Sequence, residues 1–288
     1  MATDKRTLAT FEILQSEIEE DRRRNILEHQ QAVRVSGIRR RKRGTGPLNI
    51  LAEGDSWFRY PFYAETITQL KTMGTRKPFI LNLAHWGDTA TEMLGVTQRT
   101  RIIANLTAPP NGRFDALLFS AGGNDLAGDQ FCLWLTQFVA GAVPANGIDY
   151  QRLANILGVV QAAYVDLIKI RTQIDPDCVI FLHGYDFAVP DGRPACPNIG
   201  PWLQPSLKLR GWTGAAAKAI VKEVLLALHY MLFQLERDFK NVVYVRTQGT
   251  LRQNHTDWAN ELHPTESGFT AIAKVFLAAL AKRFPGRI

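Results

Sequence analysis

A serine that follows a short apolar run is the first residue in this sequence whose setting suggests chemistry. Residues 48–52 are mostly apolar, as in a buried strand, and Gly54 ends the run before Asp55, Ser56 and Trp57. A strand that stops abruptly at such a turn can hold a serine hydroxyl rigidly at a sheet edge, where a neighbouring base activates it as a nucleophile. Gly, Asp and Ser also favour ordinary turns, so this segment alone does not establish a catalytic serine.

Two further glycine-containing turns carry groups that could stabilise an oxyanion. The first ends in Gly87, which lacks a Cβ and would let a substrate oxygen approach its N–H closely. The second joins Gly122 and Gly123 to Asn124, whose side-chain amide could donate a hydrogen bond to a developing negative charge. Read one at a time, both turns are equally compatible with a simple strand-to-helix connection.

A histidine near the C-terminus is the candidate general base. His263 precedes Pro264, and because proline fits the first position of a helix, we expect the imidazole at a helix entrance in the same layer of loops as Ser56. Three groups could orient its ring: Asn260, a backbone carbonyl, or Asp257. We favour Asn260 or a carbonyl, because Asp257 lies six positions upstream.

The elements that must position these groups follow from alternating apolar runs and longer helical patterns. Continuously apolar runs are typical of parallel strands that are buried on both faces, and the stretches between them are long enough for crossover helices. The sequence therefore predicts an α/β fold, a three-layer α/β/α sandwich with a five-stranded parallel sheet, with ligands bound outside the carboxyl ends of the strands. The expected strands are 48–52, 79–84, 116–121, 178–183 and 242–245, and the clearest helices are 151–174, 213–235 and one around 269–280.

The remaining loops supply candidate pocket walls. His183 and Asp186 could be taken for metal ligands, but two such groups are too few without a third, so we interpret them as wall or structural residues. Residues 189–202 are dense in Pro and Gly and are typical of an irregular lid. Aromatic side chains near these loops would suit an acyl chain or a sugar face. The candidate substrate-binding residues are Trp57, Trp86, Tyr185, Asp186 and Trp202.

Composition narrows the class of protein. The chain has 288 residues, 46% of them hydrophobic, which allows one large α/β domain or two small ones. Cys132, Cys178 and Cys196 match neither a disulfide framework nor a zinc pattern, and Cys178 lies in an apolar run, as a small core residue would. The first residues lack the apolar region of a signal peptide, and no apolar run reaches transmembrane length, so we expect a cytoplasmic location.

The first 47 residues differ from the rest, and we divide the chain into a helical arm with a basic linker, 1–47, and a catalytic domain, 48–288. The arm holds 11 Lys/Arg against 7 Asp/Glu, so it carries +4 of the formal charge of +7. The basic run 39–43 could contact nucleic acid or anionic lipid, but no interleaved aromatics suggest base stacking, and we favour a solvated linker and no nucleic-acid partner. The expected helix, from 7 to about 33, could pack on the domain or join two subunits of a homo-oligomer. We expect the arm to be dispensable for chemistry.

Together, the four candidate segments resemble the sequence blocks of the SGNH hydrolases, also called the GDSL esterase/lipase superfamily. They occur in the family's order, over about residues 48–284. This chain departs from the pattern once, because the family expects Asp-x-x-His where Asn260 precedes His263 here. The matching segments are Gly54-Asp55-Ser56-Trp57 (with Trp in place of the usual Leu), Asn82-x-Ala84-x-x-Gly87, Gly122-Gly123-Asn124-Asp125, and Leu262-His263-Pro264 followed by Gly268.

The resemblance implies a flavodoxin-like SGNH fold and a serine ester hydrolase that needs no metal or organic cofactor. Ser56 would attack the acyl carbonyl, and His263 would take the hydroxyl proton and return it to the leaving alcohol. The Ser56 and Gly87 N–H groups and the Asn124 amide would hold the oxyanion. Short acyl esters, lipid esters and acetylated sugars all occur as substrates in the family. The alternative, which Asn260 supports, is a catalytically weakened SGNH-fold protein that binds acylated or carbohydrate ligands.

Overall fold

A five-stranded parallel sheet forms the centre of the molecule. The computed structural model describes residues 5–37 and 44–288, with side chains from residue 16 onward in the first range. The strand order is β2-β1-β3-β4-β5 with every pair parallel, which is the flavodoxin-like order and confirms the predicted sheet. The strands are β1 (Asn49–Gly54), β2 (Phe79–Asn82), β3 (Ala116–Ser120), β4 (Val179–His183) and β5 (Val242–Val245).

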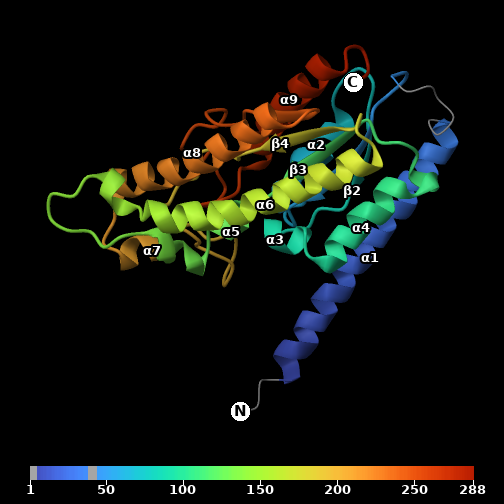
Figure 1. Ribbon diagram of the computed structural model, residues 1–288. Coiled ribbons are helices and arrows are strands. Elements are labelled where there is room, and N and C mark those ends of the chain that lie inside the picture. Colours follow the sequence, from blue (N-terminus) through green and yellow to red (C-terminus); the bar gives the residue numbers. More distant parts are fainter. Residues whose placement is uncertain (1–4, 38–43) are drawn as a thin grey trace.

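Helices cover both faces of the sheet, as the three-layer prediction requires (Figure 1). On one face α2 (Thr66–Thr72) packs against α9 (Glu266–Arg283); the other carries α4 (Val96–Thr107), α6 (Tyr150–Ile174) and α8 (Gly214–Asp238). β1, β3 and β4 are buried along their whole length, which explains why their sequences are mostly apolar; the polar residues in them, such as Asn49 and Glu53, are buried as well. The shorter helices are α3 (Ala90–Met93), α5 (Gly123–Leu126) and α7 (Gln204–Leu209), with 3₁₀ turns η2 (Pro109–Asn111), η3 (Asp129–Trp134) and η4 (Pro144–Gly147).

The start of the closing helix differs from the prediction. α9 begins at Glu266, and the Thr265 hydroxyl caps it by accepting a hydrogen bond from the N–H of Gly268 at 3.1 Å. The prediction that Pro264 takes the first helical position is therefore wrong. A threonine hydroxyl satisfies a free helix N–H, which proline cannot do, and this places the helix start two residues later.

Among the described helices, α6 alone is long and apolar enough to cross a membrane by length and composition. In this fold its inner face is buried at Leu153, Val160 and Tyr164, and the Tyr164 ring packs edge-on against Phe119 of β3 with ring centroids 4.9 Å apart. The same face buries Arg171, whose guanidinium donates to the carbonyl oxygen of Cys178 at 2.6 Å. Burial of this kind is typical of a core helix in an α/β sandwich.

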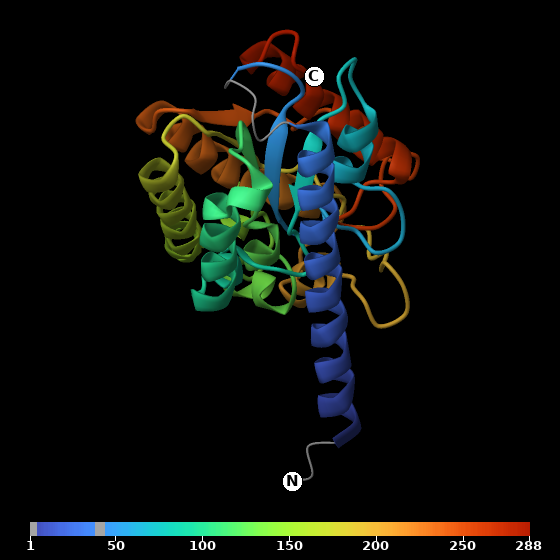
Figure 2. The ribbon, with the colours of Figure 1, turned by 90° about the vertical axis from the view of Figure 1, so that its right-hand side faces the viewer.

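The N-terminal helix α1 (Lys5–Ser36) packs on the edge of the sheet at β2, and its first turns extend beyond the rest of the molecule (Figure 2). His29 Nε2 lies 2.8 Å from Asn49 Oδ1, its ring stacks on Phe114, and Val33 is fully buried. The arm therefore docks on its own domain, which was one of the two placements left open. The basic run 39–43 lies outside the described residues.

Candidate active site

A serine and a histidine from opposite ends of the chain meet at the carboxyl edge of the sheet. Ser56 Oγ lies 2.7 Å from His263 Nε2, although 207 positions separate the two residues. Ser56 follows β1 in a tight turn in which the Asp55 carboxylate accepts from the N–H of Trp57 at 3.0 Å. Ser56 and His263 are each 6% exposed, so the pair is shielded from bulk water but still reached from a pocket.

Asn260 holds the histidine from its other side. Its Oδ1 lies 2.9 Å from His263 Nδ1 and also accepts from the backbone N–H groups of His263 and Leu262, at 2.9 and 3.1 Å. Its Nδ2 donates to the hydroxyl of Tyr60 at 3.0 Å. These contacts fix the amide with its oxygen toward the ring, so Nδ1 carries the proton and the Nε2 lone pair faces Ser56.

Asp257 does not reach this site. Its carboxylate pairs with Arg252, accepting from the guanidinium at 3.0 and 3.1 Å and from the Arg252 N–H at 2.8 Å. The hydrogen bonds from Arg252 hold the pKa of Asp257 below its usual value. Among the described residues, Asn260 is the candidate partner that contacts the His263 ring.

The absence of a carboxylate beside His263 has an electrostatic consequence. Burial lowers the pKa of His263 to about 3, because a charged imidazolium is poorly solvated there. The ring is therefore neutral at physiological pH, with its Nε2 lone pair toward Ser56, and it is a weaker base than an exposed histidine. Asn260 orients the ring but carries no charge to stabilise the imidazolium that forms.

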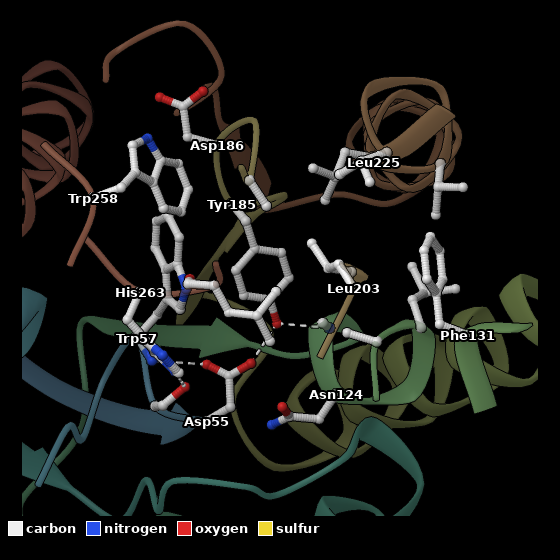
Figure 3. Close-up of a pocket in the computed structure, with 18 residues that line it drawn as sticks. Asp55, Trp57, Asn124, Phe131, Tyr185, Asp186, Leu203, Leu225, Trp258 and His263 are labelled. Carbon is white, nitrogen blue, oxygen red and sulfur yellow. Dashed lines mark hydrogen bonds between the residues drawn. The ribbon is translucent and has the colours of Figure 1, made fainter. Parts of the chain in front are cut away.

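Of the candidate oxyanion donors, Asn124 lines the same pocket as Ser56, and Gly87 lies in the loop that follows β2. Among the described residues no acceptor binds the N–H of Ser56 or of Gly87. Gly87 has φ +87, a conformation that favours glycine, and a Cβ there would meet nothing within 4 Å. The Asn124 side chain lines the pocket (Figure 3) and donates one of its two amide hydrogens to the carbonyl oxygen of Asp88 at 2.9 Å, which leaves the second for a ligand.

Replacing Asn124 with alanine should lower kcat by about 100-fold or more while KM changes little, because this donor strengthens most as the oxyanion develops. Steady-state kinetics on a soluble ester measure the effect. Asn155→Ala, a change at an exposed amide on α6, is the matched control. A change confined to KM would make Asn124 a substrate-binding residue instead.

A buried polar network forms the floor of the site. The Asp55 carboxylate accepts from the hydroxyl groups of Tyr185 and Ser120, and burial raises its pKa to about 6. The Tyr185 hydroxyl in turn accepts from the N–H of Gly123 at 2.9 Å. A Cβ at Gly123 would come within 2.8 Å of the Tyr185 ring, so glycine is required at this close approach. The network positions the turn that carries Asn124.

The other residues proposed as pocket walls divide by what they touch. Tyr185 and Asp186 line the pocket, but the polar atoms of both are engaged inside the protein, since Asp186 accepts from the N–H groups of Gly249 and Leu251 at 2.7 Å each. His183 is likewise internal, because its Nε2 contacts Ser120 Oγ at 2.8 Å. Within the described residues no three His, Cys, Asp or Glu side chains gather as metal ligands would.

The three candidate tryptophans take different places. Trp202 lies edge-on to His263, with ring centroids 5.3 Å apart, beside the reacting groups. Trp57 lines the pocket but is only 3% exposed, and its indole N–H donates to the carbonyl oxygen of Leu262. Trp86 lines a separate groove together with His85 and the arm. Of the three, Trp202 is the one that is partly exposed and has its ring against His263.

Glu261 anchors the lid, residues 189–202, and was not among the site residues predicted from the sequence. It is fully buried, and its carboxylate accepts from four backbone N–H groups at 2.6–3.0 Å. The segment 189–202 has no helix or strand of its own, as predicted. A glutamate two positions before His263 was the available signal, but nothing local indicates that a glutamate will be buried. The four donors are Gly192, Trp202, Leu203 and Gln204.

An apolar pocket opens beside Ser56 and His263 (Figure 3). It has a volume of about 60 Å³, and its walls come from α5, η3, α8 and the two residues that flank the lid, Ala188 and Leu203. Most of the side chains that line it carry no polar group. They include Leu126, Phe131, Leu203, Val221, Val224 and Leu225. Ser56, His263 and Asn124 thus line one apolar pocket, an arrangement that is compatible with acyl transfer.

No protein-family model matches the sequence, and no curated protein matches it either. Solved structures do match. A lipase from a goat rumen metagenome has 16% identity and a TM-score of 0.53, with 81% of this chain and 97% of that chain covered. An extracellular lipase from Streptomyces rimosus has 16% identity and a TM-score of 0.52, with 80% of this chain and 98% of that chain covered. With its flavodoxin-like sheet and its four ordered sequence blocks, the chain therefore has the fold of the SGNH hydrolase superfamily.

Proposed function

We propose that the protein is a serine ester hydrolase that acts on esters of short-chain carboxylic acids. The observation that carries this proposal is the hydrogen-bonded series Ser56–His263–Asn260 at the carboxyl edge of the sheet, beside an apolar pocket. The two similar lipases support the general class through their fold, and the residue roles rest on the geometry.

In the proposed reaction, Ser56 Oγ attacks the acyl carbonyl carbon while His263 Nε2 takes the hydroxyl proton. The N–H groups of Ser56 and Gly87 and the amide of Asn124 stabilise the tetrahedral oxyanion. His263 then returns the proton to the leaving alcohol as its C–O bond breaks. A water molecule, deprotonated by the same ring, releases the acid from Ser56 and regenerates the enzyme.

The volume of the pocket is the argument for a short acyl group. An enclosed apolar cavity of roughly 150 Å³ accommodates benzene, so the 60 Å³ here corresponds to an acyl chain of about two to four carbons. A sugar ring would meet few polar partners inside it, because Asp186 and Tyr185 are already satisfied. A sugar or another alcohol is better placed on the leaving-group side.

A series of p-nitrophenyl esters tests the proposal. We expect kcat/KM to be highest for acyl chains of about two to four carbons and to fall for longer ones. Leu225→Ala removes a half-buried side chain from the pocket wall and should shift the optimum to longer chains. Leu209→Ala, at a leucine that is 68% exposed, is the matched control. An optimum at long chains in the wild type would contradict the short-chain assignment.

The alternative of a non-hydrolytic binding protein is favoured by one observation, the neutral Asn260 beside His263. It predicts that the wild type binds short-chain esters without turning them over. The same ester series separates the two functions, because only a hydrolase releases p-nitrophenol in a Ser56-dependent way.

A further inference from the structure

Arg22 on the N-terminal helix is buried, unlike the arginines beside it. Its side chain is 6% exposed, whereas Arg23 and Arg24 face solvent. A buried arginine is unfavourable unless its donors are paired. Its Nε donates to the carbonyl oxygen of Leu83 at 2.9 Å, and its Nη2 donates to the Asp88 carboxylate at 2.8 Å.

These two contacts hold both ends of the loop that carries Gly87. Leu83 lies at the end of β2, and Asp88 directly follows Gly87. A second residue of the same helix adds to the clamp, since Asn25 Nδ2 donates to the carbonyl oxygen of Asn82 at 3.1 Å. Packing does not fix the conformation of Gly87, because a Cβ built there would meet no atom within 4 Å. Its φ is +87. The direction of its N–H therefore depends on how the rest of the loop is held, which is by the N–H of His85 on the carbonyl oxygen of Gly54 at 2.9 Å and by the contacts at the two loop ends.

Asp88 extends the contact from the arm to a second oxyanion donor. Its carboxylate binds Arg22, while its backbone carbonyl accepts from the amide of Asn124 at 2.9 Å. A movement of Asp88 would thus disturb the orientation of both Asn124 and the neighbouring Gly87. Arg22 also offsets negative charge, since the pKa of the fully buried Glu53 is raised by burial and lowered by Arg22.

We propose that Arg22 is a positioning residue for the oxyanion hole, and that the docked N-terminal helix is a working part of the active site. The proposal rests on the proposed esterase function and assigns to the arm a role in that same site. It reverses the expectation from sequence that the arm is dispensable for chemistry, because removing the first 43 residues would also remove Arg22 and Asn25.

The test variant is Arg22→Met, which keeps the length of the side chain and removes its hydrogen-bond donors. It is compared with the conservative variant Arg22→Lys and with the control Arg24→Met on the exposed face of the same helix. A displaced oxyanion donor raises the transition-state barrier more than it weakens substrate binding. We therefore expect Arg22→Met to lower kcat about 10- to 100-fold with KM changed less than about threefold. Arg22→Lys should recover part of the loss, and Arg24→Met should match the wild type.

Asp88→Asn provides a second route in case Arg22→Met does not fold. It keeps the backbone carbonyl that holds Asn124 and removes the charge that holds Arg22, so kcat should fall about 10-fold, again with little change in KM. Circular dichroism and thermal unfolding establish that each variant is folded. Wild-type kcat in folded Arg22→Met or Asp88→Asn, or an equal loss in Arg24→Met, would overturn the positioning role while leaving the esterase proposal intact. A wild type without Ser56-dependent turnover would instead overturn both.

Discussion

Replacing Ser56 with alanine is expected to lower kcat by about a million-fold, the size of effect that loss of the nucleophile has in serine hydrolases. The acyl-enzyme cannot form without Oγ, and only the oxyanion donors and the pocket remain to accelerate attack by water. The fold should be unaffected, because the change removes a single oxygen whose hydrogen-bond partner is the His263 ring.

Hydrolysis of p-nitrophenyl butyrate measures the loss, and intact-mass analysis after a fluorophosphonate probe reports the covalent step directly. The wild type should gain one probe adduct and Ser56→Ala none. Ser267→Ala, at an exposed serine on α9, should behave as the wild type. Equal labelling of the wild type and Ser56→Ala would show that another residue is the nucleophile.

Replacing His263 with alanine should cost nearly as much, because Ser56 is a weak nucleophile until Nε2 takes its proton. Residues that act as one unit are not additive, so the double variant Ser56→Ala/His263→Ala should be no worse than either single variant. Single-turnover kinetics with a reactive ester measure all three. A double variant much slower than both singles would mean that the two residues act independently.

The pH dependence of kcat/KM is a second test of His263 as the base. Because burial lowers the pKa of His263 to about 3, the wild type should show no loss of kcat/KM from this ring between roughly pH 5 and 8. Asn260→Asp places a carboxylate at Nδ1, which favours the imidazolium and raises the pKa of His263. Activity should be kept or increased at neutral pH, and it should fall as the pH drops through the raised pKa. An unchanged profile would show that residue 260 does not govern the base.

The strands and the turns could be predicted from the sequence, because residues that are adjacent along the chain determine them. A strand buried on both faces is mostly apolar, and a chain that turns sharply at its end favours residues such as Gly54 or Gly122. The helix start at Glu266 was missed by two residues because two candidate start signals, Pro264 and Thr265, lie side by side.

The sequence predicted the hydrogen-bond partner of His263 only in part. The spacing of Asn260 and His263 allowed contact, but the direction of the amide depends on Tyr60, which is 200 positions away along the chain. Asp257 was equally plausible from its charge, and it is held away from the ring by Arg252. Buried carboxylates such as Glu261 gave no local signal, because their acceptors are filled by backbone N–H groups from other loops.

By itself, the sequence determined the α/β class, the order of the strands along the chain and the identity of Ser56, Asn124 and His263 as candidates for one site. Only the tertiary structure decided which neighbours these residues have: the amide oxygen of Asn260 on the imidazole, and Arg22 of the arm on Asp88. The physical reason is the range of the interactions. Strand and turn preferences act between adjacent residues, whereas a buried ion pair between residues 66 positions apart forms only where packing brings an unsatisfied charge to its partner.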